Sequence, residues 1–247
     1  MSRIAVTLGA FLCLAGAPAF AEPTPVTIRA ISKDAKFIGD SMGGVRVVLT
    51  DAATGKELAR WMITGATGDT QKIVVAPRGR PSAISTPEAA ALHLSLDLDR
   101  PTLVKAEAVG PLGKPDAQIT VTSMMWLLPG KPISGDGWML EFPGLVVEPS
   151  WRAVPGGFEV AAKVTLMCGC PIEPGGHWDA AKYEVRATLY DAEKPLGSTT
   201  LAYAGKPSSF AGVIPHPKPG AYRLLVTAIN SETGNVGVVE RQATVTP

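Results

Sequence analysis

Two of the three cysteines in the chain lie two positions apart, and a histidine follows them closely. The segment 167–179 reads MCGCPIEPGGHWD and contains Cys168, Cys170 and His177. The glycine between the cysteines lets the backbone turn sharply, so both thiols can face the same side. Two thiolates and an imidazole are ligands for soft or borderline metals such as Cu(I) and Zn(II). The segment therefore indicates a copper or zinc site formed by Cys168, Cys170 and His177.

Two neighbours of these residues are second-tier candidates. Met167 could add a thioether, but the alternation of a strand ending here would direct it away from Cys168. Trp178 could shield a soft metal from solvent. His216, in the sequence IPHP, is expected in a loop at the opposite end of its domain and is excluded as a ligand within one chain. The spacing matches no standard zinc pattern, which leaves a coordination position open or supplied by a partner chain.

The cysteine pair also permits two interpretations that need no metal. An exported protein can keep a disulfide, and Cys168 and Cys170 would then form a structural staple. A disulfide across one intervening residue closes a very small ring, and the resulting strain would make the bond easier to reduce. The same two residues would then exchange thiols and disulfides with other molecules. Metal site, exchange site and staple all remain open from the sequence.

A second motif, GDSMG at residues 39–43, fits the G-x-S-x-G pattern around the nucleophile of serine hydrolases. That nucleophile requires a strand before it and a helix after it. Because residues 45–49 predict a strand, a turn is the better interpretation of Ser41. His93 alternates outward with polar residues on another predicted strand, and nothing places it near Ser41. No nucleophile and base can be assembled from the sequence, so we do not expect an enzyme.

The first 21 residues have the pattern of a cleaved secretory signal. Arg3 precedes an apolar run over residues 4–15, and the segment ends in Ala-Phe-Ala, a small-x-small cleavage pattern. The run is shorter than the ~20 residues that span a bilayer, and no later stretch reaches that length. Its removal takes away Cys13 and leaves only the pair at 168 and 170. The sequence predicts a periplasmic or secreted protein without a membrane span, in a compartment where disulfides persist.

Composition and charge exclude several classes of partner. The chain has 247 residues, of which 46% are hydrophobic, with 23 Lys and Arg against 22 Asp and Glu. This apolar fraction is typical of a globular protein. A protein that neutralises phosphates needs a basic surplus, so no nucleic-acid partner is expected. The expected partner is another periplasmic protein.

The elements that must position the cysteine loop are predicted to be strands. Short alternating or β-branched segments separated by glycine and proline predict a β-sandwich over residues 22–147. Its strands are predicted at residues 26–30, 45–49, 57–63, 72–76, 91–98, 102–109, 118–126 and 138–147. Residues 86–91 could form a short helix with Thr86 as its N-cap. Trp61 and Trp126 lie in apolar strands and are expected in the core.

A second set of strands fills residues 148–247. Residues 158–166 alternate cleanly, and further strands are predicted near Trp151 and over 183–190, 197–203, 209–214, 221–230 and 236–245. About seven strands in about one hundred residues is the number found in an immunoglobulin-like sandwich. The segment PGAYRL at 219–224 resembles the start of strand F in immunoglobulin-like and fibronectin type III-like domains, where a tyrosine folds back on the preceding corner. The resemblance implies a fold and no particular function, and the inter-sheet cysteine pair of antibody domains is absent.

The sequence thus predicts an all-β protein with two β-sandwich domains, 22–147 and 148–247, after a signal peptide over residues 1–21. The second domain would carry the cysteine loop, and the first would dock or position a partner. We expect a non-enzymatic accessory protein that binds a soft metal, copper before zinc, through Cys168, Cys170 and His177. Thiol–disulfide exchange and a structural or protein-binding module are the alternatives.

Overall fold

Strands dominate the computed structural model, which describes residues 21–77, 79, 82–215 and 218–245. The first half contains β1 (Glu22–Ser32), β2 (Val45–Asp51), β3 (Glu57–Ile63), β4 (Leu92–Leu98), β5 (Thr102–Gly110), β6 (Ile119–Leu127) and β7 (Ile133–Phe142). The second half contains β8 (Leu145–Val154), β9 (Gly157–Leu166), β10 (Glu184–Asp191), β11 (Lys194–Thr200), β12 (Ala202–Tyr203), β13 (Ser209–Pro215), β14 (Gly220–Asn230) and β15 (Asn235–Val245). Short helical turns in the described ranges are η1 (Asp40–Met42), η2 (Gln71–Val75), η3 (Pro115–Ala117) and η4 (Ala180–Lys182). The predicted all-β fold class is confirmed, whereas the predicted signal peptide falls almost entirely outside the described residues.

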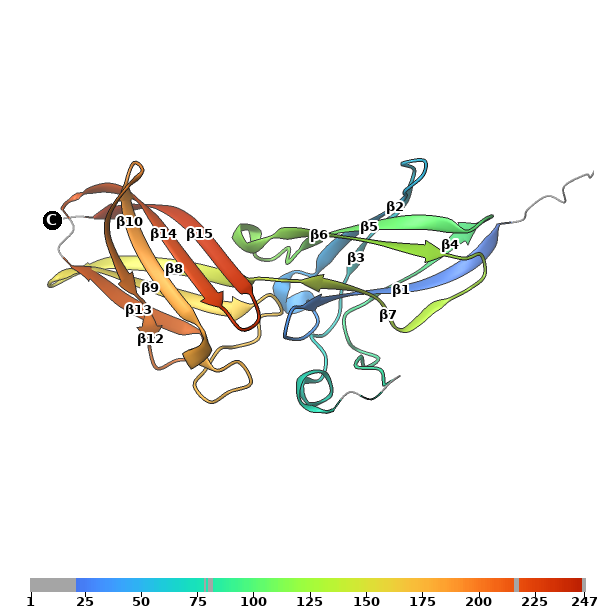
Figure 1. Ribbon diagram of the computed structural model, residues 1–247, viewed down its shortest axis with the longest axis horizontal. Helices are drawn as coiled ribbons and strands as arrows, with labels where there is room; N and C mark the ends of the chain where they lie inside the picture. Colours follow the sequence, from blue (N-terminus) through green and yellow to red (C-terminus); the bar gives the residue numbers. More distant parts are fainter. Residues whose placement is uncertain (1–20, 78, 80–81, 216–217, 246–247) are drawn as a thin grey trace, which may run out of the picture.

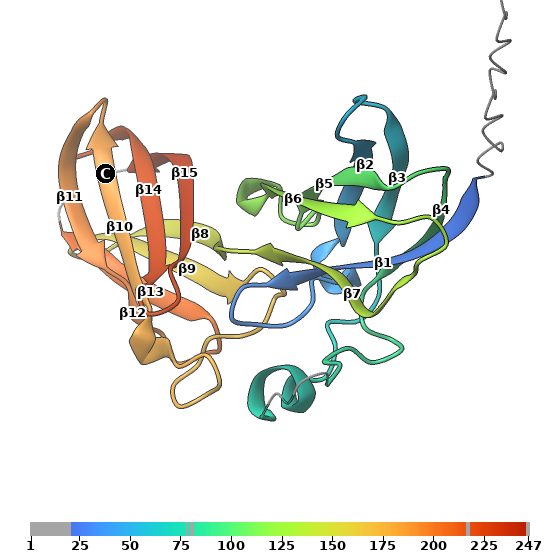
Figure 2. The same cartoon turned by 45° about the vertical axis from the view of Figure 1, so that its right-hand side comes forward.

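The first half is a sandwich of two sheets (Figures 1 and 2). One sheet has the strand order β4-β1-β7 and the other has the order β3-β2-β5-β6. Neighbouring strands are antiparallel except β1 and β7, which run parallel. Side chains alternate along β5, where Val104, Ala106 and Ala108 are buried while their neighbours are partly exposed. They join Ile28 of β1 in one apolar core between the sheets.

The second half is also a sandwich, with the sheets β12-β13-β9-β8 and β11-β10-β14-β15. The alternation predicted along residues 158–166 is confirmed. Its apolar face is buried in a second core and consists of Phe158, Val160, Ala162, Val164 and Leu166. Tyr222, near the start of β14, donates a hydrogen bond from its hydroxyl to the carbonyl of Lys218, with an O···O distance of 2.8 Å. This is the fold-back contact predicted for that tyrosine.

The two halves meet at a link between strands and at a buried polar side chain. The strand predicted over residues 138–147 is interrupted at Gly144, which has φ of +133°, so that β7 and β8 follow one another across the middle of the molecule (Figure 1). Asn235 of β15 is fully buried and accepts a hydrogen bond from the Gly144 amide at 2.9 Å. It also donates one to the carbonyl of Lys33 at 3.1 Å. One side chain of the second half therefore satisfies backbone groups at two places on the first.

The strand predicted over residues 72–76 is not formed, and residues 71–75 form the π-helical turn η2 instead. The carboxylate of Asp69 accepts a hydrogen bond from the Lys72 amide, and its carbonyl accepts one from the Ile73 amide. These local acceptors turn the backbone before it can join a sheet. Ile73 is then buried in the first core while Val75 points outward. The strand prediction is wrong here, because only Ile73 of this turn is fully buried and local hydrogen bonds decide the backbone.

Trp61 and Trp126, expected in the core, are largely exposed, at 63% and 60% of their surfaces. They lie on β3 and β6, the two edge strands of their sheet. Along β6 the side chains alternate, and Trp126 is on the outer face opposite Leu103. The prediction was wrong because an apolar residue on an edge strand need not be covered by a second sheet.

The helix predicted over residues 86–91 is a turn followed by isolated bridges to the segment 64–66. The amide of Ala90 donates to Ala66, and the amide of Ala66 donates to Glu88. The buried guanidinium of Arg29 donates to the carbonyls of Ala89 and Ala90, at 2.6 and 2.9 Å. These tertiary partners take the backbone groups that a helix would have used internally.

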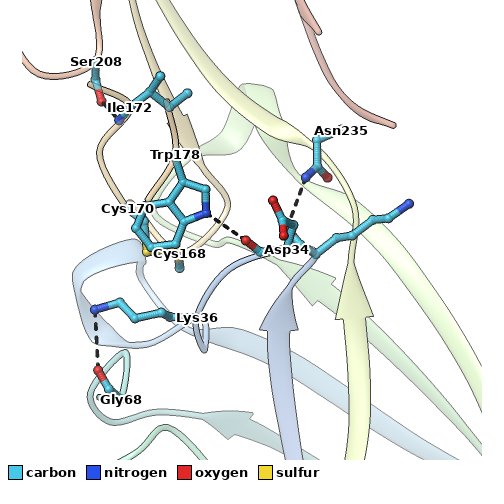
Figure 3. Close-up of a disulfide and its surroundings, with 10 residues drawn as sticks. Asp34, Lys36, Gly68, Cys168, Cys170, Ile172, Trp178, Ser208 and Asn235 are labelled. Atoms are coloured by element: carbon cyan, nitrogen blue, oxygen red, sulfur yellow. Dashed lines mark hydrogen bonds between the residues drawn. A yellow bond between two sulfur atoms is a disulfide. The ribbon is translucent and has the colours of Figure 1, made fainter. Parts of the chain in front are cut away.

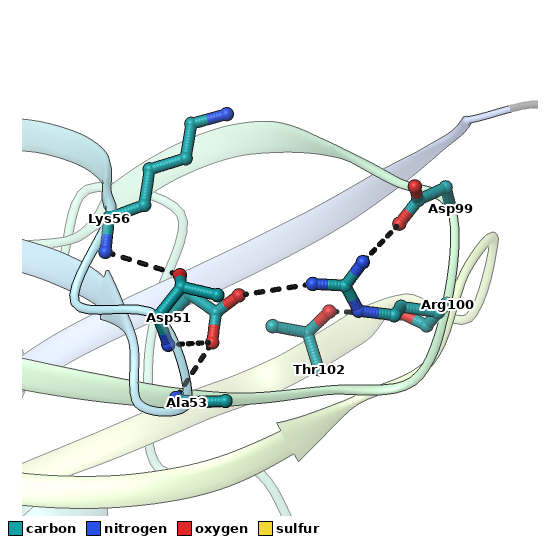
Figure 4. A network of polar contacts seen from close by, with 7 residues as sticks. Asp51, Ala53, Lys56, Asp99, Arg100 and Thr102 are labelled. Atoms are coloured by element: carbon teal, nitrogen blue, oxygen red, sulfur yellow. Dashed lines mark hydrogen bonds and ion pairs between the residues drawn. The ribbon is translucent and has the colours of Figure 1, made fainter.

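A polar network fixes the turn between β2 and β3 (Figure 4). One carboxylate oxygen of Asp51 accepts hydrogen bonds from the amides of Ala53 and Thr54, and the other forms an ion pair with Arg100 at 3.5 Å. The Ala53 hydrogen bond is the main cause that lowers the pKa of Asp51, while burial acts in the opposite direction. The hairpin of β2 and β3 is therefore held by a carboxylate in its charged form.

Candidate functional site

The cysteine loop begins directly after β9 and ends at η4. The structure joins Cys168 and Cys170 by a disulfide, and their Cα atoms are 5.4 Å apart (Figure 3). The loop closes on the strand end, because the Gly169 amide donates to Leu166 and the Leu166 amide donates to Cys170. Both cysteines are buried, with 2% and 4% of their surfaces exposed. The two sulfur-bearing residues of the prediction are thus in direct contact.

Gly169, between the cysteines, has a backbone that few other residues adopt. Its φ is +78°, in the left-handed region that favours glycine. A Cβ at this position would lie 2.8 Å from the Sδ atom of Met42, which belongs to the first half of the chain. The loop therefore needs glycine both for its turn and for close packing against Met42.

Trp178 anchors the far end of the loop to the first half. Its side chain is buried, and its Nε1 donates a hydrogen bond to the carbonyl of Asp34 at 2.8 Å (Figure 3). Partial desolvation raises the pKa of the Asp34 carboxyl, an effect that the nearby charge of Lys182 opposes. The indole places the cysteine loop beside the turn that follows β1, so that residues from both halves surround one space.

That space is a cavity of about 370 Å³ with the disulfide in its wall. The second half contributes residues 168–171, Glu173, His177 and Trp178, and the first half contributes Lys36, Ser41, Thr67 and Thr70. Lys36 is one of the lining residues, and its Nζ donates to the Gly68 carbonyl at 3.5 Å (Figure 3). The cavity thus combines a sulfur pair with an ammonium, a carboxylate, an imidazole and hydroxyl groups.

The structure brings together most of the residues that the sequence singled out. Cys168, Cys170, His177 and Trp178 all line the cavity. His177 is exposed, and its ring meets Trp178 edge-on with centroids 6.1 Å apart. Met167 is buried in the first core, away from the cavity, as the strand alternation predicted. Among the described residues, no group of three or more His, Cys, Asp and Glu side chains is arranged to hold a metal ion.

The remaining sequence candidates separate in the structure. Ser41 lines the cavity on η1, and the turn predicted for it is confirmed, with β2 following it. His93 is on β4, where its Nδ1 lies 3.1 Å from the Thr27 hydroxyl, and it does not line the cavity. The prediction for His216 lies outside the described residues. Sequence reasoning missed Lys36, Met42, Thr67 and Thr70, because nothing in a linear sequence indicates that these residues pack against a loop a hundred positions later.

A larger cavity, of about 450 Å³, lies between the end of β1, η2 and β7. Its polar side chains are Ser32, Asp34 and Glu141. It contains none of the residues for which the sequence predicted chemistry. The cavity with the disulfide is therefore the candidate site.

The fold and this cavity define an all-β sandwich protein with a buried cysteine pair in the wall of a mixed polar cavity. No known protein family matches the sequence, and no curated protein matches it either. Among solved structures, one similar chain is a DUF3823 family protein from Bacteroides uniformis, with 13% identity and a TM-score of 0.29 over 92% of this chain and 100% of that one. No helix in the described part of the chain is long and apolar enough to cross a membrane.

Proposed function

We propose that this protein is an exported, non-enzymatic accessory protein that binds copper as Cu(I) at Cys168, Cys170 and His177. The observation that carries the proposal is that these three residues line one cavity, whose other polar side chains are hydroxyls, a carboxylate, an ammonium and an indole. Thiolate sulfur and imidazole nitrogen are the donors that Cu(I) prefers over the hard oxygen ligands nearby. His177 is exposed and lines the same cavity as the sulfur pair.

Metal binding requires the reduced pair. A thiol donor supplies two electrons and two protons, which break the S–S bond and give two cysteine thiols while the donor becomes a disulfide. Metal binding then releases the thiol protons. The ammonium of Lys36, which lines the same cavity, would favour the anionic thiolates. The disulfide would thus be the resting, metal-free state of the site.

Competition with a chromophoric Cu(I) chelator tests the proposal on anaerobically reduced protein. We expect one Cu(I) bound per chain, and loss of that binding in the Cys168→Ser/Cys170→Ser variant. Glu173→Gln is the matched control, since it alters the same cavity and leaves every sulfur in place. Failure of the reduced protein to compete for Cu(I) or Zn(II) would overturn the proposal.

Thiol–disulfide exchange is the second candidate function. The disulfide between Cys168 and Cys170, in the wall of a cavity that opens to solvent, favours it. Exchange requires at least one thiol of low pKa and a reduction potential above that of structural disulfides. Equilibration with glutathione buffers measures this potential, and thiols that resist alkylation in the reduced native protein would contradict the candidate.

We infer that residues 1–21 are a secretory signal, that the mature protein resides in the periplasm or outside the cell, and that it consists of domains 22–147 and 148–247. The hydrogen bond from Tyr222 to Lys218 supports an immunoglobulin-like type for the second domain. The first domain would dock a periplasmic protein partner. N-terminal sequencing of the exported protein tests the signal, with Glu22 as the expected first residue.

A further inference from the structure

We propose that Met42 supplies a third sulfur ligand to the soft metal, so that the site is built from both halves of the molecule. The inference rests on the proposed function, because it concerns the metal held by the reduced cysteine pair. It extends the predicted ligand set by a residue that lies more than a hundred positions before the cysteines. The metal would then bridge the cysteine loop and the turn that precedes β2.

The thioether of Met42 lies close to Gly169, the residue between the two cysteines. Measured from a Cβ placed on Gly169, the Sδ of Met42 is at 2.8 Å, Cγ at 3.5 Å and Cε at 3.9 Å. The sulfur is therefore the Met42 atom nearest to the position that a Cβ on Gly169 would take. Because Gly169 separates Cys168 from Cys170, three sulfur-bearing residues surround a single glycine.

The backbone of Met42 is held firmly. Met42 closes η1, and its amide donates to the Gly39 carbonyl at 3.0 Å. Its own carbonyl accepts a hydrogen bond from the Gly113 amide at 2.8 Å. The side chain is 4% exposed, and the preceding residue, Ser41, lines the cavity. The thioether is thus held beside Gly169 and away from bulk water, while the flexible side chain allows the small movement that ligation needs.

The chemistry of three sulfur donors selects the metal. Thiolate and thioether sulfur are soft ligands that favour Cu(I). Zinc sites in proteins use cysteine, histidine and carboxylate groups in tetrahedral sets, in which a thioether has no usual place. Met42 should therefore strengthen the binding of Cu(I) and leave that of Zn(II) unchanged. His177 would then be an additional donor from the solvent side, where its exposed ring lies.

The chain offers a matched control in Met167. It is also a buried methionine, and it is adjacent to Cys168 in the sequence. Its Cε and Sδ, however, pack toward Gly144, at 3.0 and 3.8 Å from a Cβ placed there, and not toward Gly169. Leucine has nearly the same volume as methionine and is well tolerated in cores, so both replacements preserve packing.

The test compares Met42→Leu with Met167→Leu in the anaerobically reduced protein. Cu(I) affinity is measured by chelator competition, and the number of sulfur neighbours of copper by X-ray absorption. In Met42→Leu we expect one fewer sulfur neighbour and an affinity loss of at least roughly tenfold, the lower end of what even an outer-shell partner contributes. Met167→Leu should bind Cu(I) as the unaltered protein does, and Zn(II) affinity should be the same in all three proteins.

The outcomes separate this inference from the function on which it rests. If the unaltered reduced protein does not bind Cu(I), the proposed function fails, and the inference fails with it. If it binds Cu(I) but Met42→Leu keeps the same sulfur count, Met42 is not a ligand and only the inference is wrong. Equal losses in the two leucine variants would indicate disturbed packing and would also overturn the inference.

Discussion

Replacing Gly169 by alanine should destabilise the oxidised protein by about 2–4 kcal/mol, in two separable parts. The first part is the backbone, because φ of +78° costs an ordinary L-residue roughly 1–2 kcal/mol. The second part is the new methyl group, which would lie 2.8 Å from the Sδ of Met42. Overpacking of this kind costs about 1–3 kcal/mol, and the flexibility of methionine favours the lower end of that range.

Gly175→Ala is the control for the backbone part. Gly175 is in the same loop, has φ of +68°, and has no atom within 4 Å of a Cβ placed on it. The Gly175→Ala substitution should therefore lower the free energy of unfolding only by the backbone part, about 1–2 kcal/mol. Free energies of unfolding from urea titrations of the two variants give the cost of the Met42 contact by difference. In a Met42→Ala background, Gly169→Ala should cost no more than Gly175→Ala does, because the overlapping atom is gone.

Equal destabilisation by the two alanine substitutions would refute this reasoning. It would mean that Met42 does not pack against the cysteine ring in solution, and the proposal of Met42 as a ligand would lose its geometric basis. Persistence of the extra cost of Gly169→Ala after Met42 is truncated would lead to the same conclusion by an independent route.

Three further predictions concern the contacts that hold the first half and the junction. Trp178→Phe removes the hydrogen bond to the Asp34 carbonyl and should lower the free energy of unfolding, measured in urea titrations, by about 1 kcal/mol. An unchanged free energy of unfolding would show that this hydrogen bond does not stabilise the fold. Arg29→Met leaves two buried carbonyls without their donor and should cost about 2–4 kcal/mol in the same assay, whereas a neutral result would show that water replaces the guanidinium. Burial raises the pKa of Asp136, but hydrogen bonds from the segment at Ile84 lower it more, so the net shift is downward. The charged form therefore stabilises the fold above about pH 4, and the stability difference between the unaltered protein and Asp136→Asn should shrink as the pH falls from 6 to 3.

The strand pattern was accessible from the sequence because a two-residue period of burial follows from strand geometry alone. It identified the apolar face of β9 and the strands β2 and β3. It failed at residues 71–75, where hydrogen bonds to Asp69 turn the backbone locally. It also failed for Trp61 and Trp126, because sequence does not show which strands are at the edges of a sheet. Local periodicity gives strands, whereas sheet order depends on contacts between distant residues.

The residues of the candidate site also differ in whether they are close in the sequence or are brought together by packing. Cys168, Cys170 and His177 are close in the sequence, so their meeting at one cavity needed only a tight turn at Gly169. Met42 depends on how the two halves pack, and that packing is set by distant contacts such as the one between Asn235 and the Lys33 carbonyl. No spacing rule links these positions. The sequence could therefore predict the half of the site that one loop supplies and not the half that the other sandwich supplies.

Because of where the disulfide lies, the three functional interpretations predict different effects of reduction and of copper on the stability of the protein. Cys168 and Cys170 belong to the second core, while Met42 belongs to the first, so the cysteine ring lies where the two cores touch. If the disulfide is only structural, the protein should lose stability on reduction and should not regain that stability when copper is added. If the pair exchanges thiols and disulfides, the protein should lose little stability on reduction, since it must remain folded in both the oxidised and the reduced state. A metal site shared by the two halves should regain stability when Cu(I) binds the reduced protein, because a ligand that binds only the native state stabilises it. Thermal unfolding of the oxidised, reduced and copper-loaded forms distinguishes these cases, and absence of stabilisation by copper would leave the metal interpretation without support.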